Sequence, residues 1–213
     1  MNIDSNKIRF LSRIGAALCL SDDSFISDAM KKALDEGIDA EEIREVILTA
    51  YLFDGYPTAL EGFRLLSEVT VETLRTPDEF SYSQENVSLW RERGMPLCKK
   101  IYGKQFEQLM NRVKVFAPEL SDAMIVEGYG KVLSRPTFST TLRELCVVAI
   151  LASKRKPRQL LSHALGAMRL GATPQHIELL IESISEIVPE EILESSVSTI
   201  RQAMRKFTVN VTH

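Results

Sequence analysis

An internal repeat with an offset of 134 residues (171 − 37 = 134) constrains this 213-residue chain more than any other feature. Identical residues recur at this offset in both parts of the chain, and the pairs are Arg9 and Arg143, Leu11 and Leu145, Ala33 and Ala167, Gly37 and Gly171, and Ile43 and Ile177. A fixed period of this kind is the signature of a repeated structural unit. The sequence therefore predicts two copies of one ancestral module.

The two copies differ where chemistry would need polar side chains. Glu144 and His163 belong to the second copy, and the residues 134 positions earlier are Phe10 and Ala29. An acid and a base are thus matched by apolar residues. We expect the second copy to carry any reaction and the first copy to be structural.

Apolar residues recur at helical spacing along most of the chain, for instance at Ile43, Val46, Ile47 and Ala50, and no convincing alternating run is present. The sequence therefore predicts an all-α fold. Helix ends are marked similarly in both copies, because Gly37 precedes the capping residue Asp39, and Gly171 precedes Thr173 and Pro174. The expected helices cover residues 5–20, 24–36, 40–53, 56–69, 84–93, 98–115, 119–133, 140–153, 157–170, 174–187 and 190–207.

A polar stretch around Pro77 interrupts the helical pattern between Thr70 and Asn86. We place a connection there. The predicted organisation is a first, partial copy over residues 1–75, a connection over 76–90, and a second copy with the Glu144 and His163 pair over 91–213.

Composition excludes several classes of partner. Lys and Arg total 26 against 29 Asp and Glu, for a net charge of −3, so we expect no basic field that would attract nucleic acid. No apolar run approaches the roughly 20 residues that span a bilayer, and the first residues lack the pattern of a signal peptide. We therefore expect no membrane partner and a cytoplasmic location. The three cysteines are widely spaced, which argues against a disulfide framework and against a CxxC site.

Several segments together resemble the carboxymuconolactone decarboxylase family of the alkyl hydroperoxidase D-like superfamily. In the second copy they are residues 129–136 (Tyr-Gly-Lys-Val-Leu-Ser-Arg-Pro), 142–145 (Leu-Arg-Glu-Leu), 159–167 (Gln-Leu-Leu-Ser-His-Ala-Leu-Gly-Ala) and 170–173 (Leu-Gly-Ala-Thr). The first copy adds residues 37–43 and the Gly-x-Pro-x-Ala motif of residues 55–59. The resemblance covers most of residues 5–69 and 91–187.

This resemblance implies an alkyl hydroperoxidase D-like helical bundle in which the two tandem copies form an intramolecular pseudo-dimer. It also implies decarboxylation of a small carboxylated lactone without a metal or an organic cofactor. His163 would then donate the proton and Glu144 would orient the imidazole or exchange protons with it. Arg135 is a candidate for holding a substrate carboxylate, and Tyr129 and Tyr56 are candidates for lining the pocket, Tyr56 only if the first copy packs over the second.

Other interpretations of these residues are open. Glu144 fits a surface or interhelical salt bridge, and His163 fits a hydrogen-bonded histidine at the edge of the core. Arg135 would equally well anchor a loop to helix carbonyl groups. Cys146, among aliphatic neighbours, is expected to be a small core residue, and no histidine has the company that a metal site needs.

Two alternative functions follow from the same pattern. A thiol peroxidase of this superfamily would need a CxxC motif at positions 156 and 159, which here are Lys156 and Gln159, so only Cys98 or Cys146 near His163 could supply a thiol. A non-catalytic, assembly-forming relative is favoured by the loss of the polar pair in the first copy and by residues 188–191, which replace Asp-Gly-Tyr-Pro at the repeat position. Because single-copy relatives form rings of six, the duplicated chain is predicted to form a homotrimer.

Overall fold

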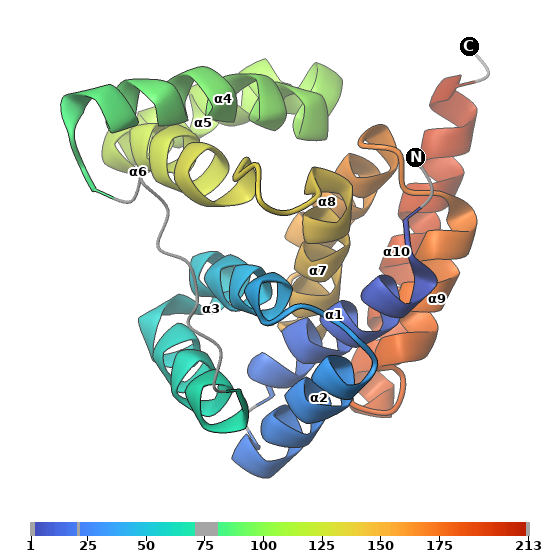
Figure 1. Cartoon of the computed structure of the whole chain (residues 1–213). Helices are drawn as coiled ribbons and strands as arrows, with labels where there is room; N and C mark the ends of the chain where they lie inside the picture. Colours follow the sequence, from blue (N-terminus) through green and yellow to red (C-terminus); the bar gives the residue numbers. More distant parts are fainter. Residues whose placement is uncertain (1–2, 21, 71–80, 212–213) are drawn as a thin grey trace.

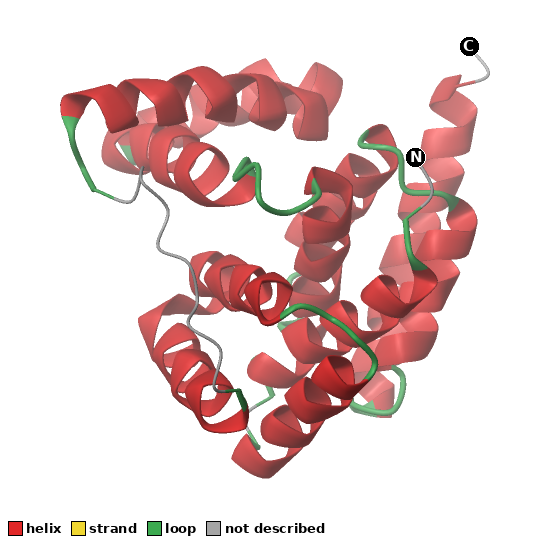
Figure 2. Ribbon diagram, viewed as in Figure 1, coloured by secondary structure: helices red, strands yellow, loops and turns green. Residues whose placement is uncertain are grey.

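The computed structural model describes residues 3–20, 22–70 and 81–211, and the regular elements within these ranges are all helical (Figure 2). The expectation of an all-α protein is therefore confirmed. The α-helices of the first part are α1 (Ser5–Leu18), α2 (Asp23–Asp35) and α3 (Ala40–Val69). The middle part contains α4 (Gln84–Tyr102), the short 3-10 helix η1 (Gly103–Gln105), α5 (Phe106–Phe116), α6 (Pro118–Ala123) and the π-helix η2 (Met124–Leu133), and the last part contains α7 (Thr140–Ser153), α8 (Pro157–Arg169), α9 (Pro174–Ile184) and α10 (Glu190–Val211).

The two glycines of the repeat end equivalent helices in the same way. Gly37 and Gly171 have φ angles of 81° and 105°, which favour glycine because it has no Cβ. Beyond each glycine the next amide closes the same bond: Ile38 N donates to Ala33 O at 2.9 Å, and Ala172 N donates to Ala167 O at 2.9 Å. These are equivalent helix C-terminal motifs at an offset of 134 residues.

Helix α3 differs from the two separate helices expected at 40–53 and 56–69. The chain passes through Gly55 with φ 88° and continues past Pro57 without an intervening loop, so α3 is one element with a sharp bend. Proline is tolerated here because it lies just after the bend, where the preceding turn of helix has already been interrupted. The bend brings the residues on either side of Gly55 to the cavity described below.

A second difference concerns residues 84–115. The expected break between 93 and 98 is absent, because α4 continues through Pro96 to Tyr102 and stops at Gly103, whose φ is 56°. Positive φ at Gly103 ends the helix more effectively than Pro96, which removes a single backbone hydrogen bond.

Helix packing follows the repeat. Shifting α1 by 134 residues gives α7, and shifting the first half of α3 gives α9. Helix α1 packs against α7 and α9, and α7 in turn packs against α3 (Figure 1). Each copy thus lays its first helix against a later helix of the other copy, which is the arrangement that a pseudo-dimer would have.

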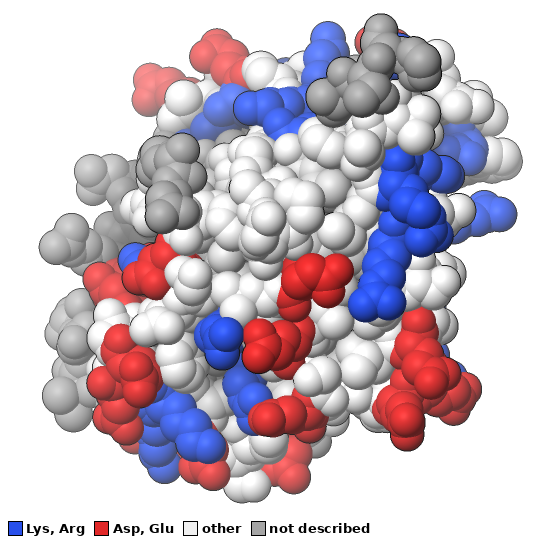
Figure 3. Space-filling model, turned by 90° about the vertical axis from the view of Figure 1, so that its right-hand side faces the viewer, with Lys and Arg blue, Asp and Glu red and all other residues white. Residues whose placement is uncertain are grey.

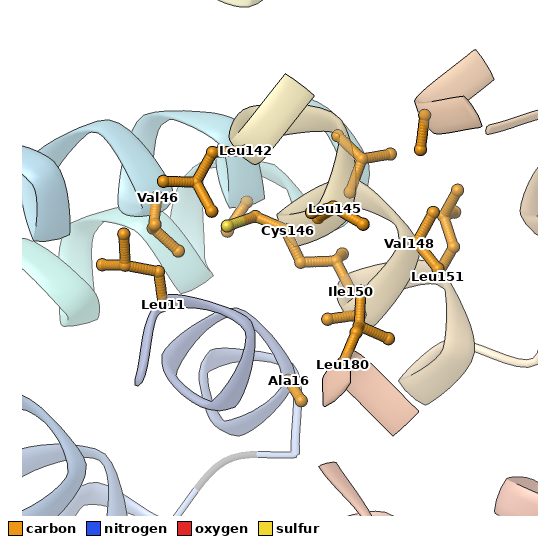
Figure 4. Close-up of a cluster of buried hydrophobic side chains, with 14 of the residues drawn as sticks. Leu11, Ala16, Val46, Leu142, Leu145, Cys146, Val148, Ile150, Leu151 and Leu180 are labelled. Atoms are coloured by element: carbon orange, nitrogen blue, oxygen red, sulfur yellow. The ribbon is translucent and has the colours of Figure 1, made fainter. Parts of the chain in front are cut away.

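The core is centred on α7, which is buried along nearly its whole length. Leu145, Cys146 and Ile150 of α7 lie close to Leu11 of α1 and Leu180 of α9 (Figure 4). Val46 of α3 closes the same cluster. Because side chains from both copies meet here, hydrophobic burial holds the two copies together.

The middle helices form a separate layer that packs on α8 through α4 (Figure 1). Within it, α4 and η2 touch backbone to backbone: a Cβ at Gly94 would lie 2.3 Å from Ile125 O, and one at Gly130 would lie 2.1 Å from Trp90 O. This contact fixes Tyr129, the residue before Gly130. Part of the connection predicted at 76–90 lies outside the described residues, and the division at 75 and 91 stays a prediction.

Candidate active site

Glu144 and His163 form a buried pair between α7 and α8. Glu144 Oε1 and His163 Nδ1 are 2.5 Å apart, and the two side chains are 2% and 3% exposed. The helices can face each other because α7 ends at Ser153 and α8 begins at Pro157, so the turn between them is tight. The burial of Glu144 rules out the interpretation as a surface salt bridge.

The repeat-related positions of the first copy contain no such pair. Ala29 is a buried apolar residue of α2, and Phe10 packs against the core from α1. The polar pair thus lies in one copy only.

His163 lines a cavity of about 420 Å³ to which both copies contribute. The bend of the first copy's α3 supplies one wall through Tyr51, Leu52, Phe53, Gly55 and Tyr56. The middle layer and α8 supply the remainder, which is Tyr102, Leu120, Ala123, Met124, Glu127, Gly128, Tyr129, Leu133 and Gln159. A largely apolar cavity with a few converging polar groups is typical of a small-molecule site.

Aromatic rings surround the imidazole. The ring of Phe53 meets that of His163 edge to face at a centroid distance of 5.3 Å, and Tyr102 lies at 6.1 Å. Burial raises the pKa of Tyr102 to about 12 and holds the pKa of Tyr129 well above its usual value, so both phenols are neutral at physiological pH. Because Nδ1 is taken up by Glu144, the Nε2 atom of His163 is the nitrogen left for a ligand in this cavity.

A second carboxylate faces the cavity from η2. Glu127 accepts hydrogen bonds from the hydroxyl groups of Tyr51 at 2.8 Å and Tyr82 at 3.0 Å. Tyr51 also lies 3.3 Å from the hydroxyl of Tyr56. Burial and the hydrogen bond to Glu127 raise the pKa of Tyr82 to about 12. The tyrosines therefore remain donors that hold Glu127 at one side of the cavity.

The predicted pocket residues Tyr129 and Tyr56 both line the His163 cavity. Tyr129 is buried, and Tyr56 is 66% exposed, which places it at the rim. Tyr56 reaches the cavity because the first copy packs over the second, as the sequence analysis required.

The structure does not bring Arg135 to this cavity. Its Nε atom lies 2.9 Å from both carboxylate oxygens of Glu45, and Arg143 Nη2 lies 2.7 Å from Glu45 Oε2. These three buried residues form a cluster, called here the Glu45 cluster. Arg135 is bound to a protein carboxylate, so the expectation that it holds substrate is corrected; the loop-anchoring alternative was closer, although its partner is a side chain.

The thiols are poorly placed for peroxide chemistry. Burial raises the pKa values of Cys98 and Cys146 to about 12 each. With such a pKa only about one thiol in 10⁵ is ionised at pH 7. Cys146 lies in the α7 core, as the sequence analysis expected.

Several cavity residues were not identified from sequence, namely Tyr51, Phe53, Tyr102, Glu127 and Gln159. The sequence held one usable signal: Tyr51 and Phe53 precede Gly55 within the segment that resembles the family's closing motif. For Glu127 and Tyr102, on η2 and α4, no sequence pattern indicated proximity to His163. Among the described residues, no group of three or more His, Cys, Asp or Glu side chains could hold a metal ion.

Comparisons with known proteins add limited information. No family model matches the sequence. A relative among curated proteins is "Peroxisomal protein 2" of Schizosaccharomyces pombe (strain 972 / ATCC 24843), which is 25% identical over 137 residues. The match covers 64% of this chain and 63% of that protein, so the chain spans less than two thirds of its relative's length.

The surface and the helix lengths bear on the predicted partners. On the face shown in Figure 3, basic and acidic groups occupy separate patches with uncharged surface between them. This face thus has no continuous basic field of the kind that nucleic acid would need. In the described part of the chain, no helix is sufficiently long and apolar to traverse a bilayer.

Proposed function

We propose that this protein is a cofactor-free decarboxylase, or a related acid–base enzyme, that acts on a small carboxylated lactone. The observation that carries the proposal is the buried pair of Glu144 and His163 at the wall of an apolar cavity. A carboxylate on Nδ1 fixes the tautomer of the imidazole and supports its cycling between acid and base at neutral pH.

The reaction would proceed in two steps. The bond between the ring carbon and the leaving carboxylate breaks, carbon dioxide departs, and the electron pair is delocalised into a dienolate. Protonated His163 then delivers a proton from Nε2 to a distant carbon of that dienolate, and water restores the proton. The neutral hydroxyl groups of Tyr102 and Tyr129 are the candidate donors to the enolate oxygen.

An apolar cavity favours the first step. A carboxylate loses hydration when it enters such a cavity, whereas carbon dioxide is uncharged and does not need that hydration. The spread of charge in the transition state is therefore less penalised than the localised charge of the substrate.

The test is turnover of a panel of carboxylated γ-lactones by the wild-type protein and by His163→Gln and Glu144→Gln. Loss of general acid–base catalysis should lower kcat by about 10²–10⁴-fold. Circular dichroism and the Tm control for folding. Unchanged turnover by His163→Gln would reject the assignment, and a panel that the wild type leaves untouched would favour the non-catalytic alternative.

A thiol peroxidase remains the less favoured alternative because the accessible thiolate population is so small. A peroxide assay on Cys98→Ser and Cys146→Ser tests it directly. Peroxide reduction by the wild type that disappears in either variant would replace the decarboxylase proposal.

The assembly and the location are further parts of this proposal. A homotrimer of pseudo-dimers stays our prediction, and light scattering on the purified protein would give its mass. The cytoplasmic expectation also stays a prediction, and the name of the fission-yeast relative adds the peroxisome as an alternative. Imaging of a tagged full chain beside a peroxisomal marker distinguishes the two.

A further inference from the structure

We propose that Arg112 and Arg158 form an anion-binding pocket beside the His163 cavity, and that the substrate carries a retained carboxylate or phosphate group which this pair binds. The inference rests on the proposed function, because it names the chemical class of substrate for the same site. The pair is called here the arginine pocket.

The arginine pocket and the His163 cavity are adjacent. Tyr102, Leu120 and Gln159 line both, so one extended molecule can occupy the two together. The arginine pocket has a volume of about 570 Å³, and α5 and α8 supply its two guanidinium groups. The two spaces together accommodate a ligand larger than a simple lactone.

Charge is divided between the two compartments. Among the described residues, the His163 cavity is lined by the carboxylate of Glu127 and by no Lys or Arg, whereas the arginine pocket is lined by Arg112 and Arg158 and by no Asp or Glu. An anionic group is therefore repelled from the Glu127 side and attracted to the arginine side. This polarity orients a substrate with one permanent anion.

The two guanidinium groups are free to bind a ligand. Neither Arg112 nor Arg158 has an ion-pair partner within the described ranges, whereas Arg135 and Arg143 are both held by Glu45. Arg158 lies in the first turn of α8, whose N-cap residue Lys156 makes no side-chain capping bond. The positive end of the α8 dipole thus adds to the field of the arginines. Guanidinium groups bind carboxylates and phosphates in bidentate geometry, which gives both energy and orientation.

The division also fits the proposed chemistry. The carboxylate that is lost should meet an apolar environment, and the group that is retained should be paired with a cation. A receptor that is absent from the cavity and present next to it satisfies both needs. Arg112 and Arg158 thus take the role that the sequence analysis gave to Arg135.

The test measures binding of octanoate, octyl phosphate and octan-1-ol by isothermal titration calorimetry. These probes share one alkyl chain and differ in charge. The variants are Arg112→Gln, Arg158→Gln and the double variant. Arg205→Gln on α10 is the matched control, since Arg205 is exposed and has no ion-pair partner in the described part of the chain.

The wild type should bind at least one of the two anions at least tenfold more tightly than octan-1-ol. The double variant should lose this tenfold preference while its affinity for octan-1-ol stays within twofold. A stronger effect on octyl phosphate than on octanoate identifies phosphate as the retained group, and the reverse identifies carboxylate.

Three results would overturn the inference: no preference for an anion in the wild type, anion affinity of the double variant within threefold of wild type, or an equal loss in Arg205→Gln. Its failure is distinguishable from failure of the proposed reaction. Loss of lactone turnover in His163→Gln with unaltered probe binding in the double arginine variant would retain the reaction and reject the arginine pocket.

Discussion

Two buried carboxylates, Glu45 and Glu144, belong to regions of opposite character. The side chain of each is 2% exposed. Glu45 is bound by Arg135 and Arg143, whose guanidinium groups retain their protons at any physiological pH. Glu144 is bound by His163, whose imidazole can release or accept a proton in that range. The partner, rather than burial, decides whether a buried carboxylate is structural or chemically useful.

The two regions diverge from adjacent residues of one helix. Arg143 of α7 reaches α3 of the first copy, whereas Glu144 reaches α8 of the second copy. Successive residues of an α-helix differ in direction by about 100°, so neighbours can serve different surfaces. The Glu45 cluster therefore joins the copies, and the Glu144 and His163 pair faces the cavity that this joining creates.

Glu45→Gln should give the largest change in stability. It leaves two guanidinium groups buried without a counter-charge, so the free energy of unfolding should fall by about 3–5 kcal/mol. For a chain of this size that is a decrease in Tm of roughly 6–20 °C. Urea denaturation followed by circular dichroism measures it.

Glu144→Gln is the matched comparison for that experiment. The amide can still hydrogen-bond a neutral imidazole, so the expected cost is about 1 kcal/mol, while turnover is lost. Equal destabilisation by the two substitutions would break the distinction between a structural and a chemical carboxylate.

Gly166→Ala should have an intermediate effect that reaches the pair itself. A Cβ on Gly166 would lie 2.6 Å from Ile101 Cγ2 and 3.0 Å from Glu144 Oε1. Overpacking of this kind costs about 1–3 kcal/mol and would displace the carboxylate from His163. The control is Gly128→Ala in η2, where a Cβ would meet nothing within 4 Å. Thermal unfolding of both variants that shows equal Tm values would contradict the expectation.

Lys154→Met should destabilise the protein by about 1 kcal/mol or less. Lys154 pairs with Asp54, the residue before the bend at Gly55, and its side chain is 30% exposed. Partly exposed ion pairs contribute little, so this third pair should differ from the Glu45 cluster. Arg155→Met is the control, because its contact with Glu191 is longer at 3.8 Å and more exposed. A loss above about 3 kcal/mol in Lys154→Met would place this pair in the same class as Glu45.

The smallest effect concerns the thiol of Cys98. Its pKa is raised to about 12, first by burial and further by the negative charge of Glu144. The thiolate population should therefore grow tenfold for each pH unit between 7 and 11. Glu144→Gln removes the charge and lowers this pKa, so labelling of Cys98 by a thiol reagent at pH 9 should accelerate by less than about tenfold. The measurement uses a Cys19→Ser, Cys146→Ser background, and slower labelling in the variant would contradict a charged Glu144.

Much of the fold could be predicted from sequence because its signals are local. Apolar spacing indicated the helices, and Gly37 and Gly171 marked equivalent helix ends. The predicted break before residue 98 was wrong because Pro96 is a weaker terminator than the positive φ of Gly103. The candidate site was predictable in part: the contrast between Ala29 and His163 identified the active copy. Arg135 was assigned wrongly because its partner Glu45 is 90 residues away, and nothing in the sequence pairs them.

The sequence alone determined that this is a helical chain with an internal repeat and that one repeat has an acid and a base where the other has Phe10 and Ala29. The tertiary structure alone decided which cations remain free for a ligand and which carboxylates have partners. The physical reason is range. Helix periodicity and capping depend on residues within a few positions of one another, whereas charge pairing and cavity shape depend on side chains that only packing brings together.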